Sequence, residues 1–192
     1  MSRWQPNARG RLEQAALELY TERGFDQTTV AEIAERAGLT ERTFFRHYAD
    51  KREVLFWGQD ALMELVTKHI ADAPDSASPI DAVGGALQAV GEVFEGRREH
   101  ARRRQAVIAA NPGLQERELI KLASLATAVA EGLGRRGVGE PAAKLTAETG
   151  VAVFKVAFDR WISAGTDTGL ANVIANSVKE LKELTAGNKP MS

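Results

Sequence analysis

The sequence contains no cysteine, which excludes disulfide bonds and thiolate metal sites and leaves the redox compartment open. Its three histidines, His47, His69 and His100, lack the spacing of metal ligands. No apolar run approaches the roughly 18 residues that a membrane-spanning helix needs, and the N-terminus, MSRWQPNARG, has no apolar core like that of a signal peptide. We therefore expect a cytoplasmic protein with no metal site and no contact with a membrane.

Catalytic motifs and an excess of charge are missing too. We find no Ser/His/Asp set, no paired acids in a glycine-framed site and no P-loop, which argues against an enzyme and against a cofactor. The formal net charge of -1 gives no support for nucleic-acid binding by itself. The arginine-rich run from Arg97 to Arg104 is typical of a solvated helix face. A chain of 192 residues, 44% of them hydrophobic, fits one large or two smaller globular domains.

Helical patterning is clearest between Thr29 and Leu55. An apolar stripe with the spacing of one helix face is formed by Val30, Ile33, Ala34 and Ala37. Gly38 ends this helix, and Thr40 is a natural N-cap for a second one. The sequence therefore predicts two short helices joined by a tight turn, which is the helix-turn-helix pattern.

The second of these helices has two distinct sides. Phe44 and Tyr48 are one turn apart and can pack inward. The outward side is then formed by Glu41, Arg42, Thr43, Phe45 and His47. Because the second helix of such a motif lies in the major groove with its first residues at the base edges, we expect this segment to contact double-stranded DNA.

A specific series of residues runs through the same segment: Gly24-Phe25, Thr28-Thr29, Ile33-Ala34, Ala37-Gly38, Thr40, Thr43, Phe45, His47, Tyr48 and Lys51. This series resembles the pattern of the TetR/AcrR family of transcriptional regulators. Phe45 departs from it, because the family usually has a tyrosine there whose hydroxyl can reach a phosphate, whereas phenylalanine can touch a thymine methyl group or a sugar. The resemblance covers roughly residues 9 to 55. Beyond them only the helical layout and the Asn111-Pro112-Gly113-Leu114 stretch match.

The expected contacts with DNA divide into two kinds. Arg42 can form a bidentate pair with guanine, and Glu41 can accept a hydrogen bond from cytosine. Glu41 also has an alternative reading, because the helix dipole favours an acid at a helix start with or without DNA. Contacts to the DNA backbone are expected from Thr29, Thr40, Thr43, His47 and Lys51.

The rest of the chain reads as further helices, so we expect an all-α fold of about nine helices. Besides the two short helices, we expect helices near residues 8–23, 51–70, 80–95, 97–110, 114–136, 141–164 and 170–185, with capping boxes at Thr29/Glu32 and Asp50/Glu53. We place a DNA-binding domain at residues 1–50, an effector-binding and dimerisation domain at 51–186, and a disordered tail at 187–192. The basic leader with Arg3, Trp4, Arg9 and Arg11 either frays in solvent or reaches DNA as an arm.

Two of these helices have more apolar surface than a solvated helix needs. Between Gly150 and Ser163 almost no polar face remains, and the last helix carries one continuous stripe. Since the resemblance implies a homodimer, we expect these helices to form half of an intermolecular four-helix bundle. The expected interface residues are Val151, Phe158, Ile162, Val173, Ile174, Val178 and Leu181. A buried central helix within a monomer is the alternative.

The resemblance also implies an effector cavity after the linker of residues 71–79. Apolar walls are available from Phe94, Leu125, Val129, Phe154, Phe158 and Trp161, with Gln105 and Asp159 as polar groups. Small residues such as Gly84 and Ala126 can leave space for a ligand. All of these side chains fit an ordinary core equally well.

We conclude from the sequence that the chain is a homodimeric, sequence-specific DNA-binding repressor, released from a palindromic operator by a small apolar effector. A regulator that activates transcription or senses a protein partner is the nearest alternative. A helical ligand-binding protein that never contacts DNA and a helical enzyme are two further ones.

Overall fold

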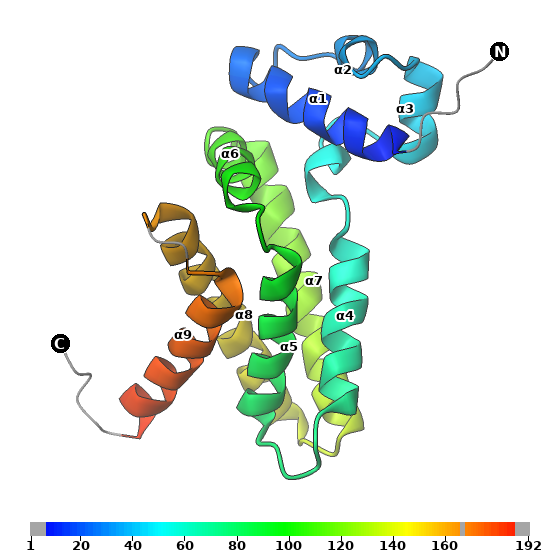
Figure 1. Ribbon diagram of the computed structural model, residues 1–192. Helices are drawn as coiled ribbons and strands as arrows, with labels where there is room; N and C mark the ends of the chain where they lie inside the picture. The colour runs from blue at the N-terminus through cyan, green and yellow to red at the C-terminus, as the bar shows by residue number, and fades with distance from the viewer. Residues whose placement is uncertain (1–6, 166–167, 187–192) are drawn as a thin grey trace. The chain divides into compact units, whose positions relative to one another are not determined.

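The computed structural model describes residues 7–165 and 168–186, and these form nine α-helices and one short 3-10 helix without any strand (Figure 1). The predicted all-α fold is therefore confirmed. The expected N-terminal arm with Arg3 and Trp4 and the expected disordered tail at 187–192 lie outside the described residues.

Apart from the start of α4, the helices begin and end close to the expected positions. In chain order they are α1 (Ala8–Arg23), α2 (Val30–Arg36), α3 (Glu41–His47), the 3-10 helix η1 (Glu53–Phe56), α4 (Gln59–Asp72), α5 (Pro79–Val93), α6 (Arg98–Ala109), α7 (Pro112–Arg135), α8 (Glu140–Ser163) and α9 (Leu170–Thr185).

Local signals account for the boundaries of the first three helices. Gly24 and Gly38 take positive φ angles of 86° and 64°, a conformation that glycine adopts without steric strain, and the chain turns at both. The predicted capping box at the start of α2 is present: the Thr29 side chain accepts from the Glu32 backbone, and the Glu32 carboxylate accepts from the Thr29 backbone. The turn between α2 and α3 therefore follows from nearby residues alone.

The expected long helix from Lys51 to about Ile70 is wrong. η1 stops at Phe56, the chain extends through Trp57, and Gly58 has a φ of 86° before α4 begins at Gln59. A residue in this left-handed conformation cannot continue an α-helix, so the segment is broken in two.

The second expected capping box is only half formed. The Asp50 carboxylate accepts from the backbone N–H groups of Arg52 and Glu53 at 2.7 and 3.2 Å. The reciprocal contact is replaced, because the Glu53 carboxylate accepts from Nε of Arg117 at 2.8 Å. The side chain that would complete the local cap instead ties η1 to the first turns of α7.

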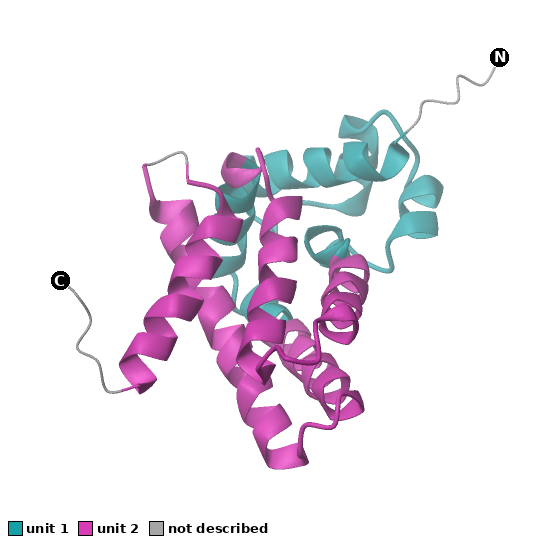
Figure 2. Cartoon of the chain, turned by 60° about the horizontal axis from the view of Figure 1, so that its bottom comes forward, with its two compact units in different colours: residues 1–58, 100–118 teal, residues 59–99, 119–192 magenta. Residues whose placement is uncertain are grey.

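The chain divides into two compact units, which Figure 2 shows in different colours. Unit 1 comprises residues 1–58 and 100–118, and unit 2 comprises residues 59–99 and 119–192. Most of α6 and the first turns of α7 thus belong with the helix-turn-helix segment. The functional domain boundary between residues 50 and 51 stays a prediction beside this division.

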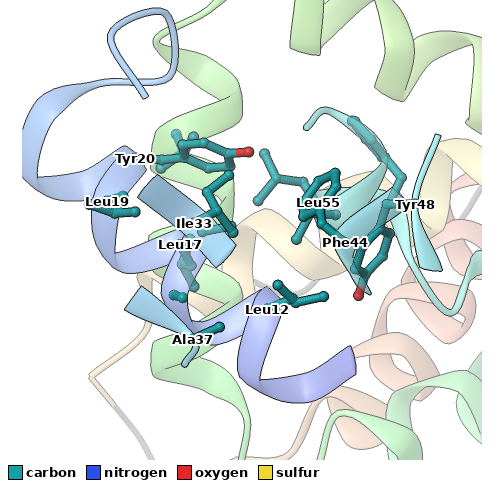
Figure 3. Close-up of a cluster of buried hydrophobic side chains, with 14 of the residues drawn as sticks. Leu12, Leu17, Leu19, Tyr20, Ile33, Ala37, Phe44, Tyr48 and Leu55 are labelled. Carbon is teal, nitrogen blue, oxygen red and sulfur yellow. The ribbon is translucent and has the colours of Figure 1, made fainter. Parts of the chain in front are cut away.

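The core of unit 1 is built around large side chains with no exposed surface (Figure 3). Leu12 of α1, Ile33 of α2 and Phe44 of α3 are each 0% exposed. Ile108 of α6 and Leu114 of α7 are also 0% exposed and lie in the same cluster. Burying a side chain of this size contributes about 1.5–3 kcal/mol. Helices α1, α2 and α3 therefore depend on α6 and α7 for part of their stability.

In unit 2, α5 packs against α4, α8 and α9, and small residues let these helices approach closely. A Cβ atom placed on Gly91 would lie 2.5 Å from the Ala171 nitrogen, and one on Gly150 would lie 2.5 Å from a Val83 methyl group. At Gly84, which we expected to leave space for a ligand, a Cβ would lie 3.3 Å from Val178. That expectation is wrong for Gly84, because the neighbouring helix fills the space.

Candidate nucleic-acid interface

Aromatic packing fixes one side of helix α3 against the core of unit 1. Phe44 is fully buried, Tyr48 is 4% exposed, and their ring centroids lie 5.5 Å apart. The Tyr48 hydroxyl also donates to the Arg9 carbonyl oxygen at 3.3 Å, which joins the end of α3 to the start of α1. With this side of α3 held in the core, the opposite side faces outward.

The residues expected to read bases lie on that outward side. Glu41, Arg42 and Phe45 are all exposed, and the Phe45 ring is 55% exposed although it packs edge-on against Phe44, with centroids 5.4 Å apart. An exposed phenylalanine held by its neighbour is suited to an apolar contact with a thymine methyl group. Arg46, which the sequence analysis did not single out, is exposed as well. Its spacing of four residues from Arg42 was the available signal.

The threonines expected to contact the DNA backbone have a structural task in the free protein. Thr29 Oγ1 donates to the Glu32 carboxylate at 2.9 Å and accepts from the Glu32 backbone at 3.2 Å. Thr40 Oγ1 accepts from the Thr43 backbone at 3.2 Å and lies 3.1 Å from the Thr43 hydroxyl. These side chains cap α2 and α3, so any contact with a phosphate would be made by groups already held in place.

His47 lies beside two cations. Burial, followed by the charges of Arg46 and Arg9, lowers the pKa of His47 below its ordinary value. Its Nε2 has almost no accessible surface and no hydrogen-bond partner among the described residues. A phosphate contact from this nitrogen therefore requires the ring to turn. Arg9 belongs to the expected basic leader and lies in α1, where its guanidinium is 5.2 Å from the centroid of the Trp57 ring.

Lys51, the last of the expected backbone contacts, faces the protein. Its Nζ donates to the carbonyl oxygens of Phe25, Asp26 and Thr28 at 2.9, 3.3 and 2.8 Å. An ammonium group has three N–H bonds, and all of them are used here. The geometry of the free protein therefore gives no support to the expected phosphate contact.

The side chains expected to line an effector cavity are only partly brought together. Phe94, Phe154, Phe158 and Trp161 form a continuous aromatic cluster in unit 2, with neighbouring centroids 5.7–6.1 Å apart. Val129 is buried, Leu125 is half-buried and Asp159 is exposed. Gln105 belongs to unit 1, where its Nε2 donates to the Glu118 carboxylate at 3.3 Å.

The residues expected at a dimer interface fall into two groups. Phe158, Ile174 and Val178 are 9%, 0% and 8% exposed and pack inside their own chain. Ile174 has no exposed surface and Phe158 and Val178 have little, so these three side chains can contribute little to an interface, and their place in one is not supported by the protomer. The other expected residues, Val151, Ile162, Val173 and Leu181, are half-buried. Large exposed apolar side chains outside that set include Leu145 and Val156 of α8 and Leu184 of α9, at 71%, 49% and 50% exposure.

The described residues include no helix that combines the length and the hydropathy of a membrane span. They also bring together no group of three His, Cys, Asp or Glu residues able to hold a metal ion.

Comparison with known proteins places the helix-turn-helix segment and the following helices in one family. The model of the tetR family of bacterial regulatory proteins matches residues 13–56, and the MftR C-terminal domain model matches residues 77–186. The HTH-type transcriptional regulator TcmR of Streptomyces glaucescens is 39% identical over 92 residues, which are 47% of this chain and 41% of TcmR. The chain thus spans less than half the length of that relative.

Two further relatives match over more of the chain. The putative mycofactocin biosynthesis transcriptional regulator MftR of Mycobacterium tuberculosis (strain ATCC 25618 / H37Rv) is 29% identical over 155 residues, which are 79% of this chain and 78% of MftR. The crystal structure of Thermus thermophilus FadR, a TetR-family repressor in complex with lauroyl-CoA, superposes with a TM-score of 0.55 at 23% identity and covers 96% of both chains. At that identity the likeness concerns the fold.

The C-terminal domain model alone matches more than half of the chain, and the N-terminal model matches the segment that holds α2 and α3. These relatives are regulators and not enzymes, which sets the helical enzyme aside. Regulators of this family bind DNA operators, act as dimers and bind small-molecule ligands. The chain belongs to the TetR family of bacterial transcriptional regulators.

Proposed function

We propose that this chain is a homodimeric repressor that binds a partly palindromic DNA operator through α2 and α3 and leaves it when a small, mostly apolar effector binds. The observation that carries the DNA-binding part is the construction of α3. Its inner side is fixed by Phe44 and Tyr48, and its outer side presents Arg42, Phe45 and Arg46. A rigid helix with two exposed cations and an exposed aromatic ring suits the major groove.

The outward side chains of α3 then have separate tasks. Arg42, in the first turn, pairs with guanine, and Phe45 contacts a thymine methyl group. Arg46 and Arg9 supply positive charge for phosphates. The capping threonines Thr29 and Thr40 contact the DNA backbone and help to fix the position of the protein along the duplex. Glu41 either accepts from a cytosine or serves only the helix dipole.

The first prediction concerns Arg42→Ala. Duplexes that bind the chain are recovered from a random library, and footprinting should find two half-sites about one helical turn apart. On the best recovered duplex, Arg42→Ala should weaken binding by about 1–3 kcal/mol and relax the preference at one base position per half-site. Affinities measured on single-base variants of that duplex check this result.

A matched control separates base reading from loss of charge. Arg135→Ala removes an exposed arginine from the end of α7 and should leave both affinity and base preference unchanged. If Arg42→Ala weakened the selected duplex and a random duplex by the same factor, Arg42 would be a phosphate contact only. A single asymmetric half-site bound by one protomer would contradict the palindromic operator.

The effector part of the proposal has its support in unit 2. The aromatic cluster of Phe94, Phe154, Phe158 and Trp161 offers faces and edges of the kind that surround apolar ligands. Effector and operator binding are then linked, and a coupling of about 1–3 kcal/mol weakens operator binding by about 5–150-fold. By reciprocity the operator weakens effector binding by the same factor. An activator, or a regulator that senses a protein partner, would share the α3 surface and differ in this unit.

The dimer part of the proposal uses the outward sides of α8 and α9. Leu145 and Val156 of α8 and Leu184 of α9 are large apolar side chains at least 49% exposed in the protomer. Burying them against a second copy would remove apolar surface from water on both sides of a two-fold axis. Val151, Ile162, Val173 and Leu181 retain enough exposed surface to border the contact.

Val156→Glu is the variant predicted to dissociate the dimer. Its side chain is exposed in the protomer, so the fold should survive, while two uncompensated carboxylates would be buried at a symmetric interface. We expect the dissociation constant to rise by roughly a hundredfold or more. Sedimentation over a range of concentrations measures it, with Lys155→Glu as the neighbouring exposed control. A parent chain that is monomeric at micromolar concentration would remove the basis of this prediction.

A further inference from the structure

Lys51 is tied to the protein through both its side chain and its backbone. Besides its three carbonyl contacts, the ammonium group lies 4.4 Å from the centroid of the Phe25 ring, within the range of a cation–π interaction. The Tyr20 hydroxyl donates to the Lys51 carbonyl oxygen at 2.6 Å. Burial raises the pKa of Tyr20 above its ordinary value, so this hydroxyl keeps the proton that it donates.

The carbonyls that Lys51 collects all belong to the turn between α1 and α2. Thr28 is 1% exposed, and its hydroxyl donates to the Gly24 carbonyl oxygen at 2.9 Å. The Thr28 N–H also donates to the Phe25 carbonyl oxygen at 3.3 Å. Thr29, the next residue, caps α2. The turn therefore sets where α2 starts, and the ammonium group of Lys51 holds three of its carbonyls at one point.

Lys51 itself lies just after α3, whose C-cap is Tyr48. One side chain thus joins the entry of α2 to the exit of α3, over a separation of 23 to 26 residues in the chain. The contacts come from α1 through Tyr20, from the turn before α2, and from the segment after α3. The turn between α2 and α3 joins the end of α2 to the start of α3. Lys51 fixes the two remaining ends, the start of α2 and the end of α3, against each other.

We infer that Lys51 is a positioning residue for operator binding, which raises affinity by fixing α2 against α3 and does not neutralise a DNA phosphate. The inference rests on the proposed DNA-binding function. It gives Lys51 the opposite role from the one expected from sequence, and the two roles differ in a measurable way. A phosphate contact releases counterions when DNA binds, whereas an internal contact does not.

The chemistry of the contact explains why lysine is needed. Three carbonyl oxygens around one point match the three N–H bonds of an ammonium group. Arginine carries the same charge, but its planar fork cannot place three donors at that point. Methionine keeps an unbranched side chain that can cover Phe25, and it donates no hydrogen bond. Lys51→Arg and Lys51→Met should therefore both loosen the turn.

The test measures operator affinity against salt. On a duplex recovered by selection with the parent chain, Lys51→Met should lower affinity by about tenfold, the size of one lost specific contact. The slope of log K against log salt concentration should stay at the parent value, because loss of one phosphate contact would reduce its magnitude by about 0.9. Lys51→Arg should also lower the affinity and leave the slope at the parent value. Lys68→Met, at an exposed lysine of α4, is the control for loss of charge alone.

A second variant and a second measurement protect the test against a simple folding defect. Tyr20→Phe removes the donor to the Lys51 carbonyl while the ring can stay in the core, and it should give a smaller loss of affinity with the slope again unchanged. In the free proteins, hydrogen exchange of the amides of residues 28–32 should be faster in Lys51→Met than in the parent chain, while exchange in unit 2 is unaffected.

Several outcomes would overturn the inference. A slope reduced by about one in Lys51→Met, with the parent slope and affinity kept in Lys51→Arg, would make Lys51 a phosphate contact. Unchanged affinity at every salt concentration would leave it a stabilising residue without a role in DNA binding. If the parent chain enriched no duplex, the proposed function would fail and this role with it. The exchange measurement would still show separately whether Lys51 orders the turn.

Discussion

Phe44→Ala should lower the free energy of unfolding of unit 1 by about 3–5 kcal/mol, the usual result of truncating a buried phenylalanine. Phe44 has no exposed surface, and its ring packs against both Phe45 and Tyr48. The helix that carries it has only seven residues and cannot be stable by itself. Loss of this ring should therefore abolish operator binding at temperatures where unit 2 is still folded.

The neighbouring phenylalanine provides the control. Phe45 is 55% exposed, so Phe45→Ala should change the free energy of unfolding by no more than about 0.5 kcal/mol. It should still weaken binding to the selected duplex if the ring contacts a thymine methyl group. Urea denaturation followed by circular dichroism, together with affinity measurements, compares the two variants. Equal loss of stability in both would mean that α3 does not have the inner and outer sides described above.

Gly91→Ala should destabilise unit 2 by about 3 kcal/mol or more, because overpacking against backbone cannot be relieved by rotating a side chain. The added Cβ would lie 2.5 Å from the nitrogen and 2.6 Å from the Cα of Ala171, at the first turn of α9. Helices α5 and α9 would have to move apart, which would also loosen the packing between Gly84 and Val178. Thermal and urea denaturation measure the change.

Gly85→Ala is the matched control in the same helix. A Cβ at this position meets no atom within 4 Å, and Gly85 is exposed in the interior of α5. Alanine loses less conformational freedom than glycine on folding, so this variant should be more stable than the parent by about 0.5–1 kcal/mol. The two substitutions add the same methyl group and should have opposite signs. A gain in stability for both would show that α5 and α9 are not held at the distance described.

The helix-turn-helix segment was predictable because its signals are local. Thr29 with Glu32, and Gly38 followed by Thr40, define helix ends within a few residues. The break at Gly58 was not predictable, since glycine tolerates both a helical and a left-handed conformation and neighbouring packing decides between them. Apolar spacing alone made the segment resemble one helix.

The role of Lys51 was out of reach for a different reason. Its partners are backbone carbonyls, which every residue has, and they lie more than twenty residues earlier in the chain. Periodicity likewise shows that α8 and α9 have wide apolar surfaces without showing which side meets the same chain. Phe158, Ile174 and Val178 were therefore expected at an interface although they lie in the protomer core.

The composition of unit 1 has a consequence for exchanging parts between regulators of this family. Its core includes Val107, Ile108 and Leu114, which come from a second stretch of chain some fifty residues after η1. A hybrid protein joined by one crossover near residue 58 would combine α1–α3 with foreign residues at those three positions. Helices α1–α3 of the hybrid would then have to pack against side chains that evolved with the helices of another regulator. A graft that also carries residues 100–118 keeps the two stretches matched. Unit 1 must therefore be transferred as two separate segments of the sequence.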